Sequence, residues 1–182
     1  MIGKQQPLFT PQTEWVPPLR LPDLSSHTEI AIDLETRDPN LLTMGSGSVR
    51  RDGEIVGIAV AVEGWSGYFP IAHEGGGNMD RELVLDWFEE VLHTDATKIF
   101  HNAMYDVSWI RSLGFQIRGG IIDTMIAASL IDEMRFSYTL DSVGKDYVGM
   151  RKNENLLKEA AQDFGVNAKA EMWRLPAPFV GE

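Results

Sequence analysis

The sequence contains no cysteine and no long apolar run. Without cysteine there is no disulfide, no thiolate metal ligand and no cysteine nucleophile, so any metal ion must be held by oxygen or imidazole ligands. No apolar segment approaches the roughly 20 residues that cross a bilayer, and the first residues lack the apolar core of a secretion signal. We therefore expect a cytoplasmic location and no membrane partner.

Basic residues are in short supply. The chain carries 16 Lys and Arg against 27 Asp and Glu, which gives a formal net charge of -11 at pH 7. Proteins that coat nucleic acid irrespective of sequence use Lys and Arg to neutralise phosphates, so this composition argues against such broad binding. A small site in which metal ions bridge protein and phosphate remains compatible with it.

Several enzyme signatures are also missing. No GxGxxG or GxxxxGK[ST] phosphate loop occurs, and there is no GxSxG nucleophile turn. The run Gly75-Gly76-Gly77 is typical of a flexible connector before a helix. Chemistry that depends on carboxylates and metal ions is therefore the class that fits the remaining residues best.

The chain is long enough for one well-packed core, because 43% of its 182 residues are apolar, and it is too short for two full domains. Residues 1–27 hold five prolines among polar residues. This composition predicts a leader, extended over the domain or disordered, in which Trp15 and Leu21 are the candidate anchors. Residues 28–182 are expected to form the domain itself.

Apolar patterns predict the order of elements along this domain. Strands are expected at 29–35, 55–62, 68–72, 98–100 and 121–122, and helices at 83–92, 103–113, 124–131, 140–148 and 154–164. The polar segment 36–54 predicts a loop, and 64–67 a turn. Three strands followed by alternating helices and strands indicate an α/β fold with a mixed sheet of about five strands flanked by helices.

Asp33 and Glu35 form the most informative acidic pair. The chain has three Asp-x-Glu matches, but Asp52/Glu54 fits a solvated turn and Asp80/Glu82 fits the first turn of a helix. Residues i and i+2 of a strand point to the same side, so the carboxylates of Asp33 and Glu35 leave one face near the strand's end. Such a pair can chelate one cation or bridge two, or it can simply be exposed.

A second group of polar residues follows the strand expected at 98–100. Asp106 lies in the first turn of a helix, where the dipole favours an acid whether or not it binds anything. His101 has the alternative of a structural hydrogen bond, and Asn102 and Asp123 have the alternative of capping helices. An α/β sheet could bring Asp106 to the same edge as Asp33, and that combination predicts a divalent-metal phosphodiesterase.

Three stretches of the sequence resemble a known family. AIDLET is similar to the first motif of the 3'-5' exonucleases of the DEDD superfamily, and HNAMYD, followed by an aliphatic helix, LGFQIRG and DTM, is similar to the second. Their order resembles the proofreading domain of family A DNA polymerases, and TEWVPP resembles polymerases of bacteriophage and prophage type. The resemblance covers roughly residues 28–182 and is most specific at 99–126. It implies a ribonuclease H-like fold.

The resemblance also implies a metal site. Asp33, Glu35 and Asp106 are implied as catalytic residues and metal ligands, with Asp33 bridging two ions. The site would hold two Mg²⁺ ions about 4 Å apart, or two Mn²⁺ ions in their place, with the scissile phosphate bound between them. Magnesium is the expected ion because it suits sites made of carboxylates, and manganese binds the same oxygens.

Thr36, Asn102 and Asp123 are implied as nucleic-acid-binding residues, with Thr36 and Asn102 near the terminal nucleotide. The implied partners are the 3' end of single-stranded DNA and a polymerase domain in the same or a companion chain. The implied activity is hydrolysis of the 3'-terminal phosphodiester during proofreading, because a mismatched terminus melts most cheaply.

One motif of the family is not found. The third motif supplies a fourth carboxylate as Tyr-x3-Asp or His-x4-Asp, whereas Tyr138 and Tyr147 are followed four residues later by Ser142 and Arg151. We expect the chain to end before this motif and to be weak or inactive alone, because positioned catalytic groups act as a unit. Two alternatives stay open: a non-catalytic nucleic-acid-binding or scaffold domain of the same fold, and a stand-alone DEDD ribonuclease.

Overall fold

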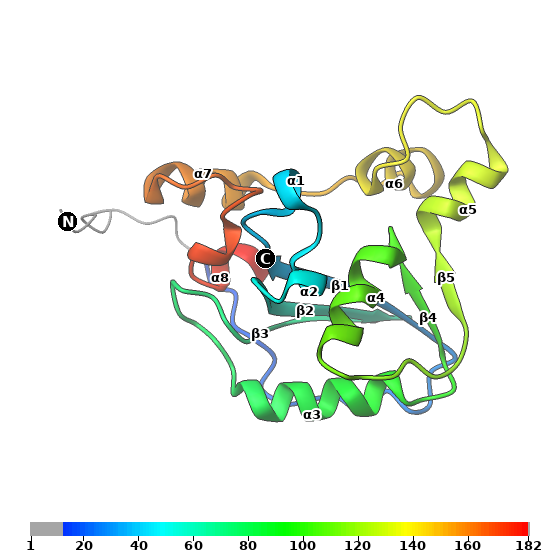
Figure 1. The fold of residues 1–182 in the computed structure, drawn as a ribbon, viewed down its shortest axis with the longest axis horizontal. Helices are drawn as coiled ribbons and strands as arrows, with labels where there is room; N and C mark the ends of the chain where they lie inside the picture. The colour runs from blue at the N-terminus through cyan, green and yellow to red at the C-terminus, as the bar shows by residue number, and fades with distance from the viewer. Residues whose placement is uncertain (1–12, 182) are drawn as a thin grey trace.

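A five-stranded mixed sheet lies at the centre of the computed structural model, which describes residues 13–181 (Figure 1). Its strands are β1 (Glu29–Arg37), β2 (Glu54–Val62), β3 (Trp65–Pro70), β4 (Thr97–Phe100) and β5 (Ile121–Asp123). The order across the sheet is β3-β2-β1-β4-β5. The pairs β1/β2 and β2/β3 are antiparallel, and the pairs β1/β4 and β4/β5 are parallel.

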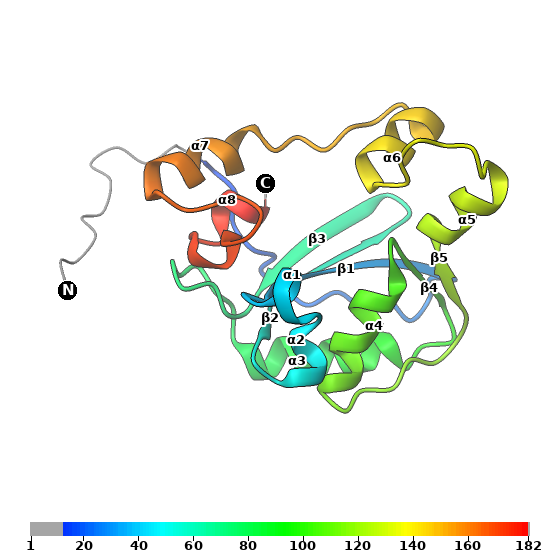
Figure 2. The ribbon, with the colours of Figure 1, turned by 45° about the horizontal axis from the view of Figure 1, so that its top comes forward.

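Helices lie on both sides of this sheet, so the predicted α/β architecture is confirmed. α3 runs along one side, and α7 and α8 lie on the other (Figures 1 and 2). The helices are α1 (Leu41–Met44), α2 (Gly47–Arg50), α3 (Arg81–Leu92), α4 (Ala103–Ser112), α5 (Thr124–Ile131), α6 (Leu140–Val148), α7 (Asn155–Phe164) and α8 (Pro178–Gly181), with a 3-10 turn at Met172–Arg174.

The main core lies between the sheet and the helices α3 and α4. Ile30, Ile32 and Leu34 of β1 are at most 5% exposed and face this core, whereas Asp33 and Glu35 leave the opposite face. The alternation arises because successive side chains of a strand point to opposite sides. Burial of each such aliphatic side chain stabilises the fold by roughly 1.5–3 kcal/mol, which fixes the register of β1 and hence the direction of its two acids.

α3 illustrates why the core side is stable. Asp80 caps the helix, and its carboxylate accepts a hydrogen bond from the Leu83 N–H at 3.1 Å. Five apolar side chains on one face of the helix are buried, as their spacing of three and four residues predicts. They are Val84, Trp87, Phe88, Val91 and Leu92.

Two local predictions differ from the structure. The predicted turn at 64–67 is wrong, because β3 begins at Trp65 and pairs there with Val62, so that Gly64 alone provides the positive φ of 79° in a shorter turn. The predicted loop at 36–54 contains α1 and α2. Tertiary bonds stabilise that segment: Asp38 accepts from the Gly47 N–H at 2.9 Å, and the hydroxyl groups of Ser48 and Ser108 lie 2.8 Å apart, which joins α2 to α4.

Of the predicted leader, residues 1–12 lie outside the described part of the chain. The rest runs along the domain: Leu24 is buried, and the Pro22 carbonyl accepts a hydrogen bond from the Trp87 indole at 2.7 Å. The ring of Trp15 lies 6.1 Å from that of Tyr68. This stretch therefore contacts both the core side of the domain, through Trp87, and β3.

The C-terminal third crosses the side of the sheet from which Asp33 and Glu35 project. α5 and α6 lie near the end of β5, and α7 and α8 lie beyond β3 (Figure 2). A second, smaller apolar cluster holds the latter pair together; its buried members are Ala160, Ala161, Leu175 and Phe179. Within residues 13–181, no helix combines the length and apolar character that a membrane crossing requires.

Candidate active site

Asp33 and Glu35 stand on the open side of β1, opposite small residues. Their register partners on β2 are Ala59 and Gly57. A Cβ at Gly57 would overlap the ring of Tyr68, which lies across that position from β3. The pairing of β1 with β2 shifts directly after Glu35, so a bulge ends the regular ladder at the second acid.

Asp106 approaches the same strand from α4. Its carboxylate is buried, and Oδ1 accepts a hydrogen bond from the Leu34 N–H at 3.0 Å. The pairing of β1 with β4 covers only Glu29 to Ala31, so the Leu34 N–H on this edge has no strand partner. The side chain of Asp106 therefore takes the place of a missing strand between the two acids of β1.

These three carboxylates line one cavity of about 560 Å³. The same cavity is bordered by His101, Asn102 and Tyr105 from the start of α4 and by side chains of α7 and α8. Within residues 13–181, however, no three His, Asp or Glu side chains stand close enough together to hold one ion. Binding of a shared cation would therefore require the acid side chains to close further around it.

Proximity and burial change the acidity of all three groups. Burial and the neighbouring charge of Asp33 raise the pKa of Glu35 to about 7, and the same two causes raise the pKa of Asp106 to about 7. Burial also raises the pKa of Asp33, while electrostatic interactions with Lys152 and His101 oppose that rise. A divalent cation would relieve this repulsion, and an all-oxygen donor set is what Mg²⁺ or Mn²⁺ prefers, so the residues fit such an ion.

Thr36 and Tyr105 form a hydrogen-bonded pair beside the acids. Their hydroxyl oxygens lie 2.6 Å apart, and the Tyr105 hydroxyl also donates to Asp38 at 3.4 Å. Tyr105 borders the cavity, whereas Thr36 is not among its lining residues. Thr36, which was predicted to bind nucleic acid, therefore lies next to the cavity, and its hydroxyl is hydrogen-bonded to Tyr105.

Asn102 lies at the cap position of α4, but the predicted side-chain cap is wrong. Its backbone is left-handed, with φ 70°, and its side chain makes no capping hydrogen bond. Asp123 takes that role instead, because its carboxylate accepts from the N–H groups of Asn102 at 3.0 Å and Ala103 at 2.8 Å. The side chain of Asn102 is thus left beside the cavity.

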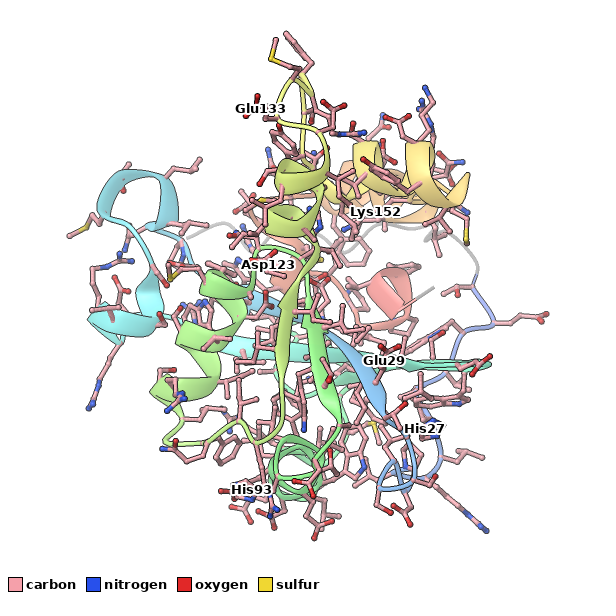
Figure 3. The ribbon with its side chains drawn as sticks, turned by 90° about the vertical axis from the view of Figure 1, so that its right-hand side faces the viewer. His27, Glu29, His93, Asp123, Glu133 and Lys152 are labelled. Atoms are coloured by element: carbon pink, nitrogen blue, oxygen red, sulfur yellow. The ribbon has the colours of Figure 1, made fainter. Side chains whose placement is uncertain are left out.

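Asp123 also caps α5, as its position predicts. Its Oδ1 accepts from the Met125 N–H at 2.9 Å and, more weakly, from the Ile126 N–H at 3.4 Å. Burial would raise the pKa of this carboxyl, but the main-chain donors outweigh that effect and lower it. Asp123 ends β5 and does not line the acid cavity (Figure 3).

His101 makes two structural hydrogen bonds. Its Nδ1 lies 2.9 Å from the Thr124 hydroxyl, and its Nε2 lies 2.9 Å from the Tyr138 carbonyl. These contacts join the start of α4 to α5 and to the segment before α6. The imidazole thus borders the cavity while both of its nitrogens are engaged elsewhere.

Sequence reasoning missed the residues that close the cavity from the C-terminal side. Lys152 and Glu154, which come between α6 and α7, line it together with apolar side chains of the later elements. Glu154 is paired with Lys158, 3.0 Å away. Neither residue belongs to a recognisable motif, and only the path of the chain over the sheet brings them to the acids.

A buried hydrogen-bond network attaches residues 172–181, which we call the C-terminal cover, to the sheet. The Tyr68 hydroxyl lies 2.5 Å from His73 Nε2, and His73 Nδ1 lies 3.2 Å from the Leu175 carbonyl. Burial lowers the pKa of His73 to about 4, so the ring is neutral at pH 7. The carbonyl requires N–H at Nδ1, so Nε2 accepts the hydrogen bond from Tyr68.

A second cavity of about 570 Å³ borders Asp33 and Glu35 from the side of β3. Small residues on neighbouring strands form part of its lining; they are Ala31, Ala59, Ala61, Ser66 and Gly67. The acid pair therefore lies between two hollows, and both are accessible from the side of the sheet opposite α3.

The sequence matches a family model described as 3'-5' exonuclease over residues 21–171. Among curated proteins, it is 38% identical to a DNA-directed DNA polymerase of Pseudomonas phage M6, over 98% of this chain and 28% of that protein. It is 27% identical to DNA polymerase DpoZ of Salmonella phage PMBT28, over 79% of this chain and 21% of the relative. The chain thus spans less than a third of the length of these relatives.

Solved structures share the fold at low sequence identity. The EXO domain of Aedes aegypti Nibbler superposes with a TM-score of 0.54 at 13% identity, covering 85% of this chain and 74% of that one. Brucella melitensis NrnC with bound Mg²⁺ gives 0.52 at 19% identity, covering 78% and 68%. Escherichia coli RNase D gives 0.51 at 16% identity, covering 86% and 43%. The predicted ribonuclease H-like fold is confirmed by these likenesses.

Proposed function

Since the chain belongs to the 3'-5' exonuclease family found in family A DNA polymerases, we propose that it removes nucleotides from the 3' end of single-stranded DNA in a metal-dependent reaction. The observation that carries the proposal is the convergence of Asp33, Glu35 and Asp106 on one cavity from β1 and α4. Their mutual repulsion favours a bound divalent cation, because no lysine or arginine forms a salt bridge with any of the three within residues 13–181.

The three carboxylates are proposed as the ligands of one or two Mg²⁺ or Mn²⁺ ions. When bound, such ions would activate a water molecule for attack on the phosphodiester and would stabilise the negative charge on the leaving 3' oxygen. Asp106 is held by Leu34, so its orientation is set before an ion arrives. Asp33 and Glu35 share the strand on either side of Leu34, and their side chains supply the oxygens that would close around the ion.

The remaining walls of the cavity suit a nucleotide. Tyr105 and Asn102 border the acids, and the apolar side chains of Met172 and Phe179 form the opposite wall. Aromatic and apolar surfaces stack nucleic-acid bases without regard to sequence. We assign these residues to the terminal base and sugar, and the carboxylates to the terminal phosphodiester.

The curated relatives support a role for this domain within a longer protein. Because the curated relatives are DNA polymerases of which this chain spans less than a third, we propose that the domain proofreads for a polymerase domain in the same or a companion chain. Mismatched 3' ends melt more easily than paired ones, which would deliver them preferentially as single strands.

One observation favours a second candidate, a domain that binds DNA without cleaving it. No three acid side chains within residues 13–181 are grouped closely enough to hold a shared ion. Glu154 is a fourth acid on the cavity, but its ion pair with Lys158 makes it a poor ligand. On this alternative the chain binds single strands and shows no turnover.

Incubation of the purified chain with 5'-labelled single-stranded DNA in Mg²⁺ or Mn²⁺ tests the proposal. Because no third motif is found, we expect the isolated chain to shorten the strand only slowly from its 3' end; EDTA should abolish this shortening and Asp33→Ala should reduce it by at least about 100-fold. Asp86→Ala is the matched control, since Asp86 is an exposed acid on α3 at the far side of the sheet. Binding without metal-dependent shortening would favour the second candidate, and RNA of the same sequence would separate a ribonuclease from a deoxyribonuclease.

A further inference from the structure

Lys152 is a cation brought to the acid cavity by the connector between α6 and α7. The connector is attached to α6 by main-chain hydrogen bonds: Gly149 and Met150 donate to the carbonyls of Lys145 and Gly144 at 3.2 and 3.3 Å. The Lys152 N–H itself donates to the carboxylate of Asp141 at 3.2 Å. The start of this side chain is therefore fixed, although the residue follows the end of the helix.

The side chain of Lys152 borders the cavity and has no acidic partner among the described residues. It lines the same hollow as Asp33 and Glu35. Within residues 13–181, no carboxylate lies within salt-bridge distance of its ammonium group. Glu154, the nearest acid along the chain, is paired with Lys158 instead. Lys152 is thus an exposed cation that lines the same cavity as the acids.

That charge acts on the acids from a distance. After burial, Lys152 exerts the largest influence on the pKa of Asp33, which it lowers, and it also lowers that of Glu35. The protein as a whole is strongly acidic, so a cation at this position opposes the repulsion that a phosphate would meet on approach. In Figure 3, Lys152 and Asp123 lie in the upper half of the view, whereas His93, at the end of α3, lies at the bottom.

We propose that Lys152 binds the 3'-terminal phosphodiester of the DNA strand opposite the three carboxylates. The inference rests on the proposed function and adds a phosphate-binding residue to it. A lysine is a compact charge on a flexible stem, which allows its ammonium to follow a phosphate that moves by one nucleotide after each cleavage. Metal ions on the acid side and Lys152 on the other would then enclose the same phosphate.

A purely structural role is the competing explanation. Lys152 could serve only to offset the charge of the cavity acids, and its removal would then alter metal affinity without any dependence on the phosphate. The two explanations can be distinguished by removing the charge of the lysine and the charge of the phosphate, singly and together. If the two groups are direct partners, the losses of binding affinity are not additive.

The test measures binding of a 5'-fluorescent oligothymidylate in Ca²⁺, a hard cation that takes the same oxygen ligands, under conditions where the oligonucleotide stays intact. One oligonucleotide is unmodified and the other carries a neutral methylphosphonate at the 3'-terminal linkage. The proteins are the wild type, Lys152→Ala, Lys152→Arg and the control Lys145→Ala, which changes an exposed lysine of α6 that does not line the cavity.

We expect Lys152→Ala to weaken binding of the unmodified strand about tenfold. The slope of log binding constant against log salt concentration should become shallower by about 0.7, the value for one phosphate contact on a single strand. Lys152→Arg should bind within about threefold of wild type, since it keeps the charge. The methylphosphonate strand should bind Lys152→Ala and wild type equally. Lys145→Ala should match wild type throughout.

Three results would overturn the inference. Equal binding of the unmodified strand by Lys152→Ala and wild type would do so, and so would independent losses from the lysine and the phosphate. In both cases the wild type still binds DNA, so the proposed function stands. Absence of both binding and cleavage by the wild type would instead remove the proposed function together with the role of Lys152.

Discussion

The Asp106 carboxylate accepts a hydrogen bond from the Leu34 N–H at 3.0 Å, and this bond joins α4 to β1 between Asp33 and Glu35. Asp106 thus does two things at once. It satisfies a main-chain donor that no strand reaches, and it lines the cavity that the other two acids share.

Two substitutions at Asp106 should separate these roles. Asp106→Asn keeps an oxygen that can accept from Leu34, so we expect little loss of stability but a loss of Mn²⁺ affinity of at least about tenfold. Asp106→Ala leaves the buried N–H without an acceptor and should cost a further 1–3 kcal/mol or so in the free energy of unfolding. Urea unfolding and Mn²⁺ titration measure the two effects, and equal stability of both variants would contradict the assigned hydrogen bond.

The stability of the metal-free chain should fall as the pH rises toward neutrality. Burial and neighbouring acids raise the pKa of both Glu35 and Asp106 to about 7, above their ordinary values of roughly 4. Between these values the folded chain holds protons that the unfolded chain has released. The free energy of unfolding therefore decreases with rising pH across that window, and the loss is complete above about pH 7.

Urea unfolding in EDTA at about pH 5 and about pH 8 checks this dependence. The double variant Glu35→Gln, Asp106→Asn should lose most of it, because the amides do not ionise. Mn²⁺ should stabilise the wild type more at the higher pH, where the carboxylates are ionised. A wild type that is more stable at the higher pH in EDTA would show that these acids do not repel one another in the folded chain.

Placements that depend on local pattern could be predicted from the sequence, whereas placements that depend on the path of the chain could not. Asp33 and Glu35 could be placed together because strand alternation alone puts i and i+2 on one face. The bounds predicted for α6 agree with the structure, since Thr139 caps its start and Gly149 ends it with φ 73°. These are signals within a few residues of the element they define.

Lys152 and Asn102 show the opposite case. Lys152 lies beyond the end of α6 in a connector without a pattern, and only the packing of the later helices brings it over β1. Asn102 is a favourable capping residue by type, yet Asp123 from the next strand takes the capping bonds of α4. A capping group 20 residues away in the chain leaves no local signature at the helix it caps.

The two-helix cap predicts a structural role for Asp123. Its carboxylate accepts from four main-chain N–H groups at the starts of α4 and α5. Asp123→Ala should lower the free energy of unfolding by about 1–3 kcal/mol, because a lost cap usually costs about 1 kcal/mol and two helices share this one. Asp123→Asn, with one acceptor oxygen, should lie between Ala and wild type.

The same variants test whether Asp123 binds nucleic acid, as the family resemblance implies. If the role is only structural, Asp123→Asn should bind a single strand as wild type does under conditions where both are fully folded. A tenfold or greater loss of binding by the folded variant would show that Asp123 takes part in binding the DNA strand. Circular dichroism on the binding samples establishes that both proteins are folded.

The contact between His73 and the Leu175 carbonyl predicts that the C-terminal cover can be loosened without touching the acids. His73→Ala removes both the acceptor of the Tyr68 hydroxyl and the donor to Leu175, two groups in a buried setting. We expect a loss of about 2–6 kcal/mol in the free energy of unfolding, since two groups are left unsatisfied and each costs roughly 1–3 kcal/mol. Tyr68→Phe removes only one bond, leaves the Nδ1–H bond intact and should cost about 1 kcal/mol.

Hydrogen exchange locates the effect. Amides of residues 172–181 should exchange faster in His73→Ala, whereas those of α3 should be protected as in wild type, because α3 packs on the other side of the sheet. Local opening of residues 172–181 would also expose the apolar wall of the acid cavity. Binding of single-stranded DNA should therefore weaken, while Mn²⁺ affinity changes little. Uniformly faster exchange in α3 and in 172–181 would instead show that the cover and the core unfold as one unit.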